Sequence, residues 1–441
     1  MLNRKLFSLV IFVFIVFLLF VCIGSGNNIF APKGMRDGAI VEVPISAFDA
    51  NGKLVNNDWK EYLQTRKPIG VIFFVDHLMK KEKSKTIIQE VKKAIGDKVI
   101  LAADEEGGKV NRIEWIDVKS AREVSSGYED VKKQKDITSA KLFVKQQYIQ
   151  MFQEMNDIGL NMTFAPNLDL NKYESLDKNS NEYKYYKQCA KYVKLFYFKQ
   201  HNKVDKNDLY EADKAELFFA FLEEIGVRKL NVLKSNEDYN NTIRMKWKTL
   251  NNKDKQKLKA QFQPLIKYAN YASVVGDRSY GDDPNLVGDM AEIFVDTANE
   301  YGINCVMKHA LGHGRVDGDT HIEKQHLNAS LSDILYDIQP YQRLSNKVHY
   351  IMPSHIVYDA VDDENSAINS KKVLNFIRRN VNKDIIFITD DMSMEGADGG
   401  MKSPCDIWII ANKPLDEIKK ISSLNKLNKK QVDKIFSKMI L

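Results

Sequence analysis

Short apolar runs rich in β-branched residues recur along most of this chain, and stretches with helical periodicity separate many of them. Alternation of this kind is typical of parallel strands joined by helical crossovers. Eight runs have strand length, and they are Ala39–Ser46, Gly70–Val75, Val99–Asp104, Leu160–Pro166, Ile303–His309, His349–His355, Asp384–Asp390 and Cys405–Ala411. Eight such strands predict an α/β fold of the (β/α)8 TIM-barrel type, with an open doubly wound sheet as the alternative.

Helical patterns lie where several barrel crossovers require them. The four ranges with helical spacing of apolar residues are Ser84–Ile95, Asn285–Tyr301, Ser330–Leu344 and Lys371–Arg379. The connection between Met394 and Cys405 is different, because its glycines and its proline leave no room for a helix. Since parallel neighbours normally need a crossover of about a dozen residues or more, we expect a somewhat irregular barrel there.

One segment is too long to be a simple crossover. Between about residues 171 and 271 the composition becomes rich in Lys, Asn and Tyr, with a basic excess. Two amphipathic helices are predicted there, Glu182–Gln200 and Leu209–Ile225. We therefore expect a helical insertion at 171–271 in a barrel formed by residues 32–170 and 272–441. The basic excess suits either a solvated helical face or a surface for anionic wall polymer or lipid headgroups.

The N-terminus carries a targeting pattern. Two cations, Arg4 and Lys5, precede a nearly unbroken apolar run from Leu6 to Ile23, which has roughly the length that spans a bilayer. We predict that residues 1–31 form a signal peptide or membrane anchor and that the protein is exported, to a periplasmic or other extracytoplasmic location. A buried core helix is the alternative interpretation.

The composition of the chain argues against two kinds of ligand, nucleic acids and metal ions. The 65 basic and 59 acidic residues give a net charge of +6, which is too mild to indicate nucleic-acid binding. The four cysteines, Cys22, Cys189, Cys305 and Cys405, lie far apart, without the spacing of a zinc site or a disulfide framework. We expect no nucleic acid as partner and no metal site.

Polar side chains follow five of the apolar runs at the point where each run ends. In a barrel the carboxyl ends of all strands meet at one rim, where active sites of this fold are built. The five strand ends are Asp104–Gly108, Pro166–Asp169, Lys308–His309, Ser354–His355 and Asp390–Asp391.

Two carboxylates, Asp390 and Asp391, end a run apolar enough to be buried on both faces. A carboxylate fixed at that position can attack an anomeric carbon and form the covalent intermediate of a retaining glycosidase. An aspartate at such a junction can equally cap the helix that follows. One catalytic and one capping aspartate would divide these roles.

The loop from Lys308 to His321 is dense in ionisable side chains and contains several glycines. Such a cluster favours a functional role over a structural one. Asp319 and His321 would form a dyad in which the carboxylate orients the imidazole and tunes it for general acid/base catalysis. A metal site is the competing hypothesis, although the glycines indicate a mobile loop more than a rigid ligand cage.

These strand ends resemble a known family. The run Asp104–Arg112, which reads DEEGGKVNR, resembles the D-x-E-G-G-x-V-x-R pattern of the β-N-acetylhexosaminidases of glycoside hydrolase family 3. The resemblance spans about residues 70 to 411 outside the insertion and implies a barrel enzyme. Further matches in the family's order are Asn161–Asp169, Gly276–Gly281, Lys308–Gly314 with His321 seven residues later, Met352 with His355, and Thr389–Met394.

The resemblance implies a role for each matching residue. Asp390 matches the nucleophile, and His321 with Asp319 matches the acid/base pair that separates this branch from the family's β-glucosidases. The implied reaction is retaining hydrolysis of terminal β-linked N-acetylglucosamine, from peptidoglycan-derived glycans, without metal or organic cofactor; phosphorolysis is a minor alternative route. The residues matching those that hold the terminal sugar are Asp104, Arg112, Arg278, Lys308 and His309.

Two other functions stay open at the level of sequence. A membrane-tethered glycan-binding protein of the same fold would keep the sugar site with little or no turnover, and a relative of different sugar specificity would hydrolyse glucosides. The presence of Asp390, Asp319 and His321 together argues against the first alternative. Lys308 and His309 beside the same dyad argue against the second.

Overall fold

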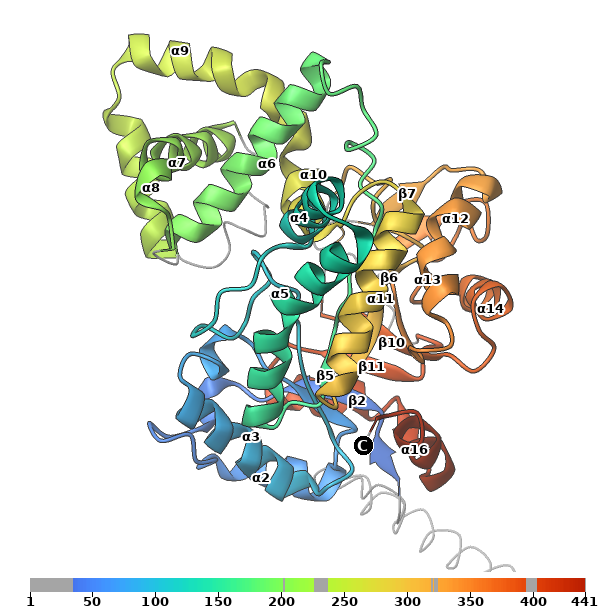
Figure 1. Cartoon of the computed structure of the whole chain (residues 1–441). Helices are drawn as coiled ribbons and strands as arrows, with labels where there is room; N and C mark the ends of the chain where they lie inside the picture. The colour runs from blue at the N-terminus through green and yellow to red at the C-terminus, as the bar shows by residue number, and fades with distance from the viewer. Residues whose placement is uncertain are drawn as a thin grey trace, which may run out of the picture.

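The computed structural model describes residues 35–200, 203–225, 237–318, 320, 324–393 and 403–440. Eight parallel strands close into a barrel in the order β10, β11, β2, β3, β4, β5, β6, β8 (Figure 1). Each of them overlaps one predicted run, so the barrel is confirmed and the open sheet is wrong. The strands are β2 (Ala39–Glu42), β3 (Gly70–Ile72), β4 (Ile100–Ala103), β5 (Met162–Thr163), β6 (Asn304–Ala310), β8 (Tyr350–Pro353), β10 (Ile386–Asp391) and β11 (Ile407–Ile410).

Side chains alternate between two cores along the barrel strands. In β4, Ile100 and Ala102 join the cluster inside the barrel, whereas Leu101 joins the layer between strands and helices. In β11, Ile407 points inward and Trp408 outward in the same way. Strands buried on both faces read as continuous apolar runs, which is why the sequence reveals them.

Helices surround the barrel. Three of the four predicted crossover helices are found as single helices, but the predicted helix Ser330–Leu344 is divided into α12 and α13. The reason is Pro340, whose ring and missing N–H prevent a continuous helix through the preceding turn. The helices around the barrel are α2 (Asn57–Arg66), α3 (Lys81–Ile95), α4 (Ala121–Gln134), α5 (Ile137–Ile158), α11 (Pro284–Glu300), α12 (Leu331–Asp337), α13 (Gln339–Leu344), α14 (Lys371–Asn380), α15 (Leu415–Ser422) and α16 (Lys429–Phe436).

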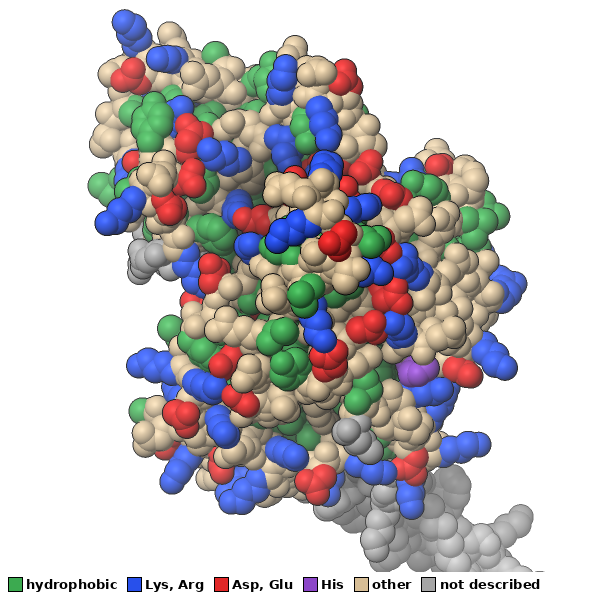
Figure 2. Space-filling model, in the orientation of Figure 1, with side chains coloured by type: hydrophobic (Ala, Val, Ile, Leu, Met, Phe, Trp, Pro, Cys, Tyr) green, Lys and Arg blue, Asp and Glu red, His purple; other side chains and the backbone are tan. Residues whose placement is uncertain are grey.

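Further helices lie between β5 and β6 and extend beyond the barrel at the upper left of Figure 1. They bury an aromatic-rich core separate from the two barrel cores. Figure 2 shows acidic side chains interspersed with the basic ones on this face. The elements are α6 (Asn181–Gln200), α7 (Leu209–Glu224), α8 (Glu237–Thr249), α9 (Asn252–Phe262), the 3-10 segment η5 (Gln263–Tyr268) and α10 (Ala269–Val274). The predicted division of the chain at residues 171 and 271 stays a prediction.

The end of the barrel where the strands begin is closed by both ends of the described chain. Strand β1 (Arg36–Asp37) pairs with β12 (Lys426–Leu427). The buried Asp37 carboxylate binds Arg66 Nε at 3.2 Å and accepts a hydrogen bond from Ser422 Oγ at 2.7 Å. Residues of α16 join the cluster inside the barrel, so this end is plugged.

Two predictions fall partly or wholly outside the described residues. The targeting segment 1–31 lies outside them, as do residues 394–402 of the predicted irregular connection. Within the described ranges, no helix is both long enough and apolar enough to cross a membrane.

Gly70 in β3 is predicted to be intolerant of a larger side chain. A Cβ atom at this position would lie 2.7 Å from both Cβ and the carbonyl oxygen of Ile100 on the neighbouring strand. Gly70→Ala should therefore lower the free energy of unfolding by about 1–3 kcal/mol, as overpacking does elsewhere. Urea unfolding of the purified variant checks this; a loss below about 0.5 kcal/mol would contradict it.

Candidate active site

The carboxyl ends of the barrel strands bring the predicted site residues to one rim. Asp104 follows β4, whereas Lys308 and His309 lie near the end of β6 and Asp390 near the end of β10. Because all eight strands are parallel, these residues occupy the same end of the barrel.

A buried charge cluster joins the ends of β4 and β6. Lys308 Nζ lies 2.7 Å from Asp104 Oδ1 and 2.6 Å from Glu106 Oε1. Arg278 forms a bidentate ion pair with Glu106, through Nε at 2.9 Å and Nη2 at 2.7 Å. Its Nη1 donates a hydrogen bond to the carbonyl oxygen of Val274 at 2.7 Å. The side chain of Arg278 therefore faces Glu106, a residue for which the sequence predicted no role.

Opposite charges decide the ionisation of this cluster. Burial alone would raise the pKa of Glu106, but the Arg278 and Lys308 cations outweigh it and hold that pKa well below its usual range. Burial alone would lower the pKa of Lys308, but Asp104 and Glu106 raise it. Glu106, Lys308 and Arg278 are thus charged at neutral pH.

His309 is oriented by a second carboxylate that the sequence did not assign. Its Nδ1 lies 2.7 Å from Asp169 Oδ2, and the backbone N–H groups of His309 and His313 donate to Asp169 Oδ1 at 3.2 and 2.6 Å. Burial opposes ionisation of Asp169, but the nearby charge of His309 lowers its pKa to about 2. Since Asp169 is ionised, Nδ1 of His309 carries the proton, and Nε2 makes no hydrogen bond within the described residues.

The backbone at Arg112 is held in place by the carboxylate of Glu105. Glu105 Oε2 accepts hydrogen bonds from the N–H groups of Arg112 at 2.7 Å and Ile113 at 3.0 Å. The Arg112 guanidinium lies over the ring of Phe74, 5.9 Å from its centroid, and its buried Nε has no hydrogen-bond partner among the described residues. The turn that precedes it needs glycine, since Gly107 has a φ of +89° and a Cβ there would lie 2.5 Å from a backbone oxygen.

The two aspartates at the end of β10 differ in their partners. Asp391 Oδ1 accepts hydrogen bonds from the N–H groups of Ser393 at 3.0 Å and Ala411 at 3.1 Å, which ties β10 to β11. Burial raises the pKa of Asp391 to about 6. Asp390 is half-buried and accepts the N–H of Asp391 at 2.8 Å. A structural role thus belongs to Asp391.

Asp319 and His321, the predicted acid/base pair, lie outside the described residues. Thr320 between them is buried, and its hydroxyl lies 3.2 Å from His313 Nε2.

These observations define the protein as a closed (β/α)8 barrel with paired charges at the rim formed by the carboxyl ends of its strands. The model of the glycosyl hydrolase family 3 N terminal domain matches residues 40–194 and 229–438, and the chain belongs to that family.

Relatives and solved structures agree with this assignment. The beta-hexosaminidase of Glaesserella parasuis is 28% identical over 166 residues, covering 35% of this chain and 49% of that protein. That of Tolumonas auensis is 29% identical over 164 residues, covering 34% and 49%. The chain thus spans about half the length of these relatives. NagZ from Neisseria gonorrhoeae, solved in complex with N-trifluoroacetyl-D-glucosamine, shares the fold with a TM-score of 0.60 at 18% identity, over 93% of this chain and 92% of that one.

Removing the charge of Glu106 should destabilise the protein. Glu106→Gln leaves two buried cations, Arg278 and Lys308, with Asp104 as their remaining carboxylate partner in the cluster, and breaking a buried ion pair in this way costs about 3–5 kcal/mol. Thermal unfolding should show a large fall in the melting temperature. The exposed Glu61→Gln is the matched control and should leave it unchanged; equal melting temperatures for both variants would contradict the prediction.

Glu105 should make stability depend on pH. Burial raises its pKa to about 8, above the value near 4.3 of an unfolded chain, so the folded state binds more protons between these two values. The free energy of unfolding contributed by this group therefore falls as pH rises from about 4.5 to about 8. Glu105→Gln should reduce that fall by about 3–4 kcal/mol between pH 5 and pH 8, because each pKa unit is worth about 1.4 kcal/mol. Urea unfolding at pH 5 and pH 8 checks it, and an unchanged pH dependence would refute it.

Proposed function

We propose that this protein is a retaining β-N-acetylhexosaminidase that releases terminal β-linked N-acetylglucosamine through a covalent intermediate on Asp390. One observation carries the proposal: groups with unused hydrogen-bonding capacity share the rim with Asp390. Asp104 Oδ2, Arg112 Nε and His309 Nε2 have no hydrogen bonds within the described residues. Ionic and bidentate groups suit a sugar, which offers several hydroxyls that need fixed partners.

The reaction follows the two-step scheme of retaining glycosidases. Asp390 attacks the anomeric carbon while protonated His321 donates its proton to the glycosidic oxygen, so the C–O bond breaks as the glycosyl–Asp390 ester forms. The neutral imidazole then takes a proton from water, which attacks the anomeric carbon and releases Asp390. Asp319 orients the imidazole and stabilises its charged form.

Asp391 is not a competing nucleophile in this proposal. Its carboxylate is engaged by two backbone N–H groups and by Ser393 Oγ at 2.5 Å, which fixes it as a link between β10 and β11. Asp390 is the aspartate of the pair that matches the nucleophile of the family's motif.

The substrate source and the location belong to the proposal as well. The apolar run Leu6–Ile23 supports export, with membrane attachment if the run is retained. Fragments of peptidoglycan are the β-linked N-acetylglucosamine glycans that an exported bacterial enzyme of this family would meet.

An aryl glycoside assay tests the proposed reaction and its nucleophile. The purified protein should release the chromophore from an aryl β-N-acetylglucosaminide but not from the matching β-glucoside, and Asp390→Ala should lower kcat by at least about 10³-fold because the covalent route is lost. Asp384→Ala is the control, since this exposed residue lies just before the same strand at the opposite end of the barrel.

The other outcomes are equally informative. Turnover of the glucoside would assign a different sugar specificity. Binding of N-acetylglucosamine without turnover of either glycoside, by a folded protein, would replace the enzyme by a glycan-binding protein of the same fold.

A further inference from the structure

The base of the helical region contacts the loop that leads to the proposed acid/base residues. Tyr271, at the start of α10, is fully buried, and its hydroxyl lies 2.9 Å from the carbonyl oxygen of Gly314 and 3.2 Å from Asn171 Oδ1. The hydroxyl oxygen of Tyr271 also accepts a hydrogen bond from the backbone N–H of Lys172 at 3.1 Å. The loop backbone is thus hydrogen-bonded directly to the base of the helical region, where residues 171–173 and Tyr271 lie.

Two further side chains from the base of the helical region bind the next residues of the loop. Tyr173 donates its hydroxyl to Asp317 Oδ1 at 2.7 Å. Lys172 Nζ lies 2.7 Å from the same carboxylate and donates to the carbonyl of Arg315 at 3.1 Å. Asp317 comes two residues before Asp319 and four before His321. These contacts therefore act on the part of the loop nearest in sequence to the proposed dyad.

The loop is held from the barrel side too. Arg315 donates Nε and Nη2 to the two oxygens of Asp337 in α12, at 2.6 and 3.0 Å. The segment Gly314–Asp317 consequently lies between two supports, one from the barrel helices and one from the helical region.

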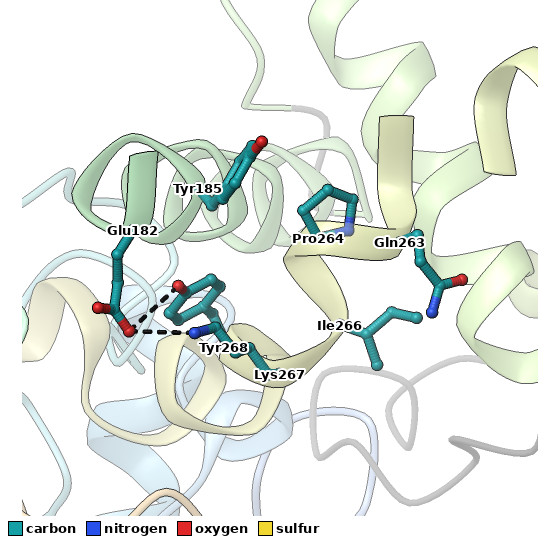
Figure 3. A pocket seen from close by; sticks show the side chains of 7 residues that line it. All are labelled: Glu182, Tyr185, Gln263, Pro264, Ile266, Lys267 and Tyr268. Carbon is teal, nitrogen blue, oxygen red and sulfur yellow. Dashed lines mark hydrogen bonds and ion pairs between the residues drawn. The ribbon is translucent and has the colours of Figure 1, made fainter. Parts of the chain in front are cut away.

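An aromatic cluster makes the second support rigid. The ring of Tyr173 stacks on Tyr186 with centroids 4.9 Å apart and meets Tyr268 and Tyr271 edge to face at 5.2 and 4.7 Å. Tyr268 is fixed in turn by Glu182, which binds its hydroxyl at 3.5 Å. Figure 3 shows this contact beside an open surface pocket between α6 and η5. Aromatic pairs of this geometry add about 0.5–1.5 kcal/mol each beyond their burial.

We propose that Lys172, Tyr173 and Tyr271 form a latch through which the helical region positions the loop Lys308–Gly318 and, with it, the general acid. These three are positioning residues, since they act through the loop and not on the sugar. The effect on general acid catalysis rests on the proposed function. The contacts that hold the loop do not depend on it. The latch depends on residues of the helical region between β5 and β6.

Leaving-group dependence distinguishes this role from general damage. A phenyl glycoside needs its departing oxygen protonated in the transition state, whereas a 2,4-dinitrophenyl glycoside leaves readily without a proton. The double variant Lys172→Met with Tyr173→Phe removes the polar contacts to Arg315 and Asp317 but retains the tyrosine ring. Tyr271 is kept, because its buried hydroxyl also bonds Asn171 and its loss would weaken the fold.

The double variant should lose about tenfold in kcat/KM on phenyl β-N-acetylglucosaminide and less than about twofold on the dinitrophenyl glycoside, as partial loss of general acid catalysis requires. Tyr192→Phe, in the core of the helical region away from this loop, is the matched control and should change neither value. Equal losses on both glycosides, or no loss on either, would overturn the positioning role.

Hydrogen exchange measures the latch without any turnover. Amides of peptides covering residues 308–318 should exchange faster in the double variant than in the wild type and in Tyr192→Phe. Unchanged exchange would overturn the latch whatever the activities. If the wild type hydrolysed neither glycoside, the proposed function would fail, and faster exchange in the double variant would still support the latch.

Discussion

The contact on which the site depends is the pair formed by Lys308 and Glu106, which joins the ends of β6 and β4 across β5. Both side chains are almost fully buried, so each would be costly to ionise alone. Asp104 and Arg278 complete the set, and the four formal charges cancel. A cluster of fixed charges with no net charge offers strong donors and acceptors to a polar ligand, and it needs little reorganisation when such a ligand binds. The closed barrel supplies the rigidity that holds these charges in place.

The strands were predictable because parallel barrel strands are buried on both faces and read as uninterrupted apolar runs. The predicted helix Ser330–Leu344 is helical but divided into two, because periodicity alone ignores Pro340 in the first turn of α13. The extent of the core formed by α6 to α10 could not be read from the sequence. Two of its amphipathic helices were visible, but α8 and α9 are strongly polar and pack through only a few apolar side chains.

Site residues were predictable where they end a strand, and less so where their partners come from elsewhere in the chain. Glu106 gained a role only when Arg278, 172 residues away, was seen to bind it. Asp169 is separated from His309 by 140 residues, although its position at the end of a predicted run was a usable signal. Asp390 and Asp391 cannot be told apart by sequence spacing, because their difference lies in which backbone N–H groups each carboxylate accepts.

The pairing of β1 with β12 has a consequence for how the molecule would stand on a surface. The described chain enters at the plugged end of the barrel, and the rim with Asp104, Lys308 and Asp390 faces the other way. Whatever precedes residue 35 therefore joins the protein at the pole opposite the site. A molecule held through residue 35 would therefore leave the rim with Asp104, Lys308 and Asp390 open on the side away from its attachment.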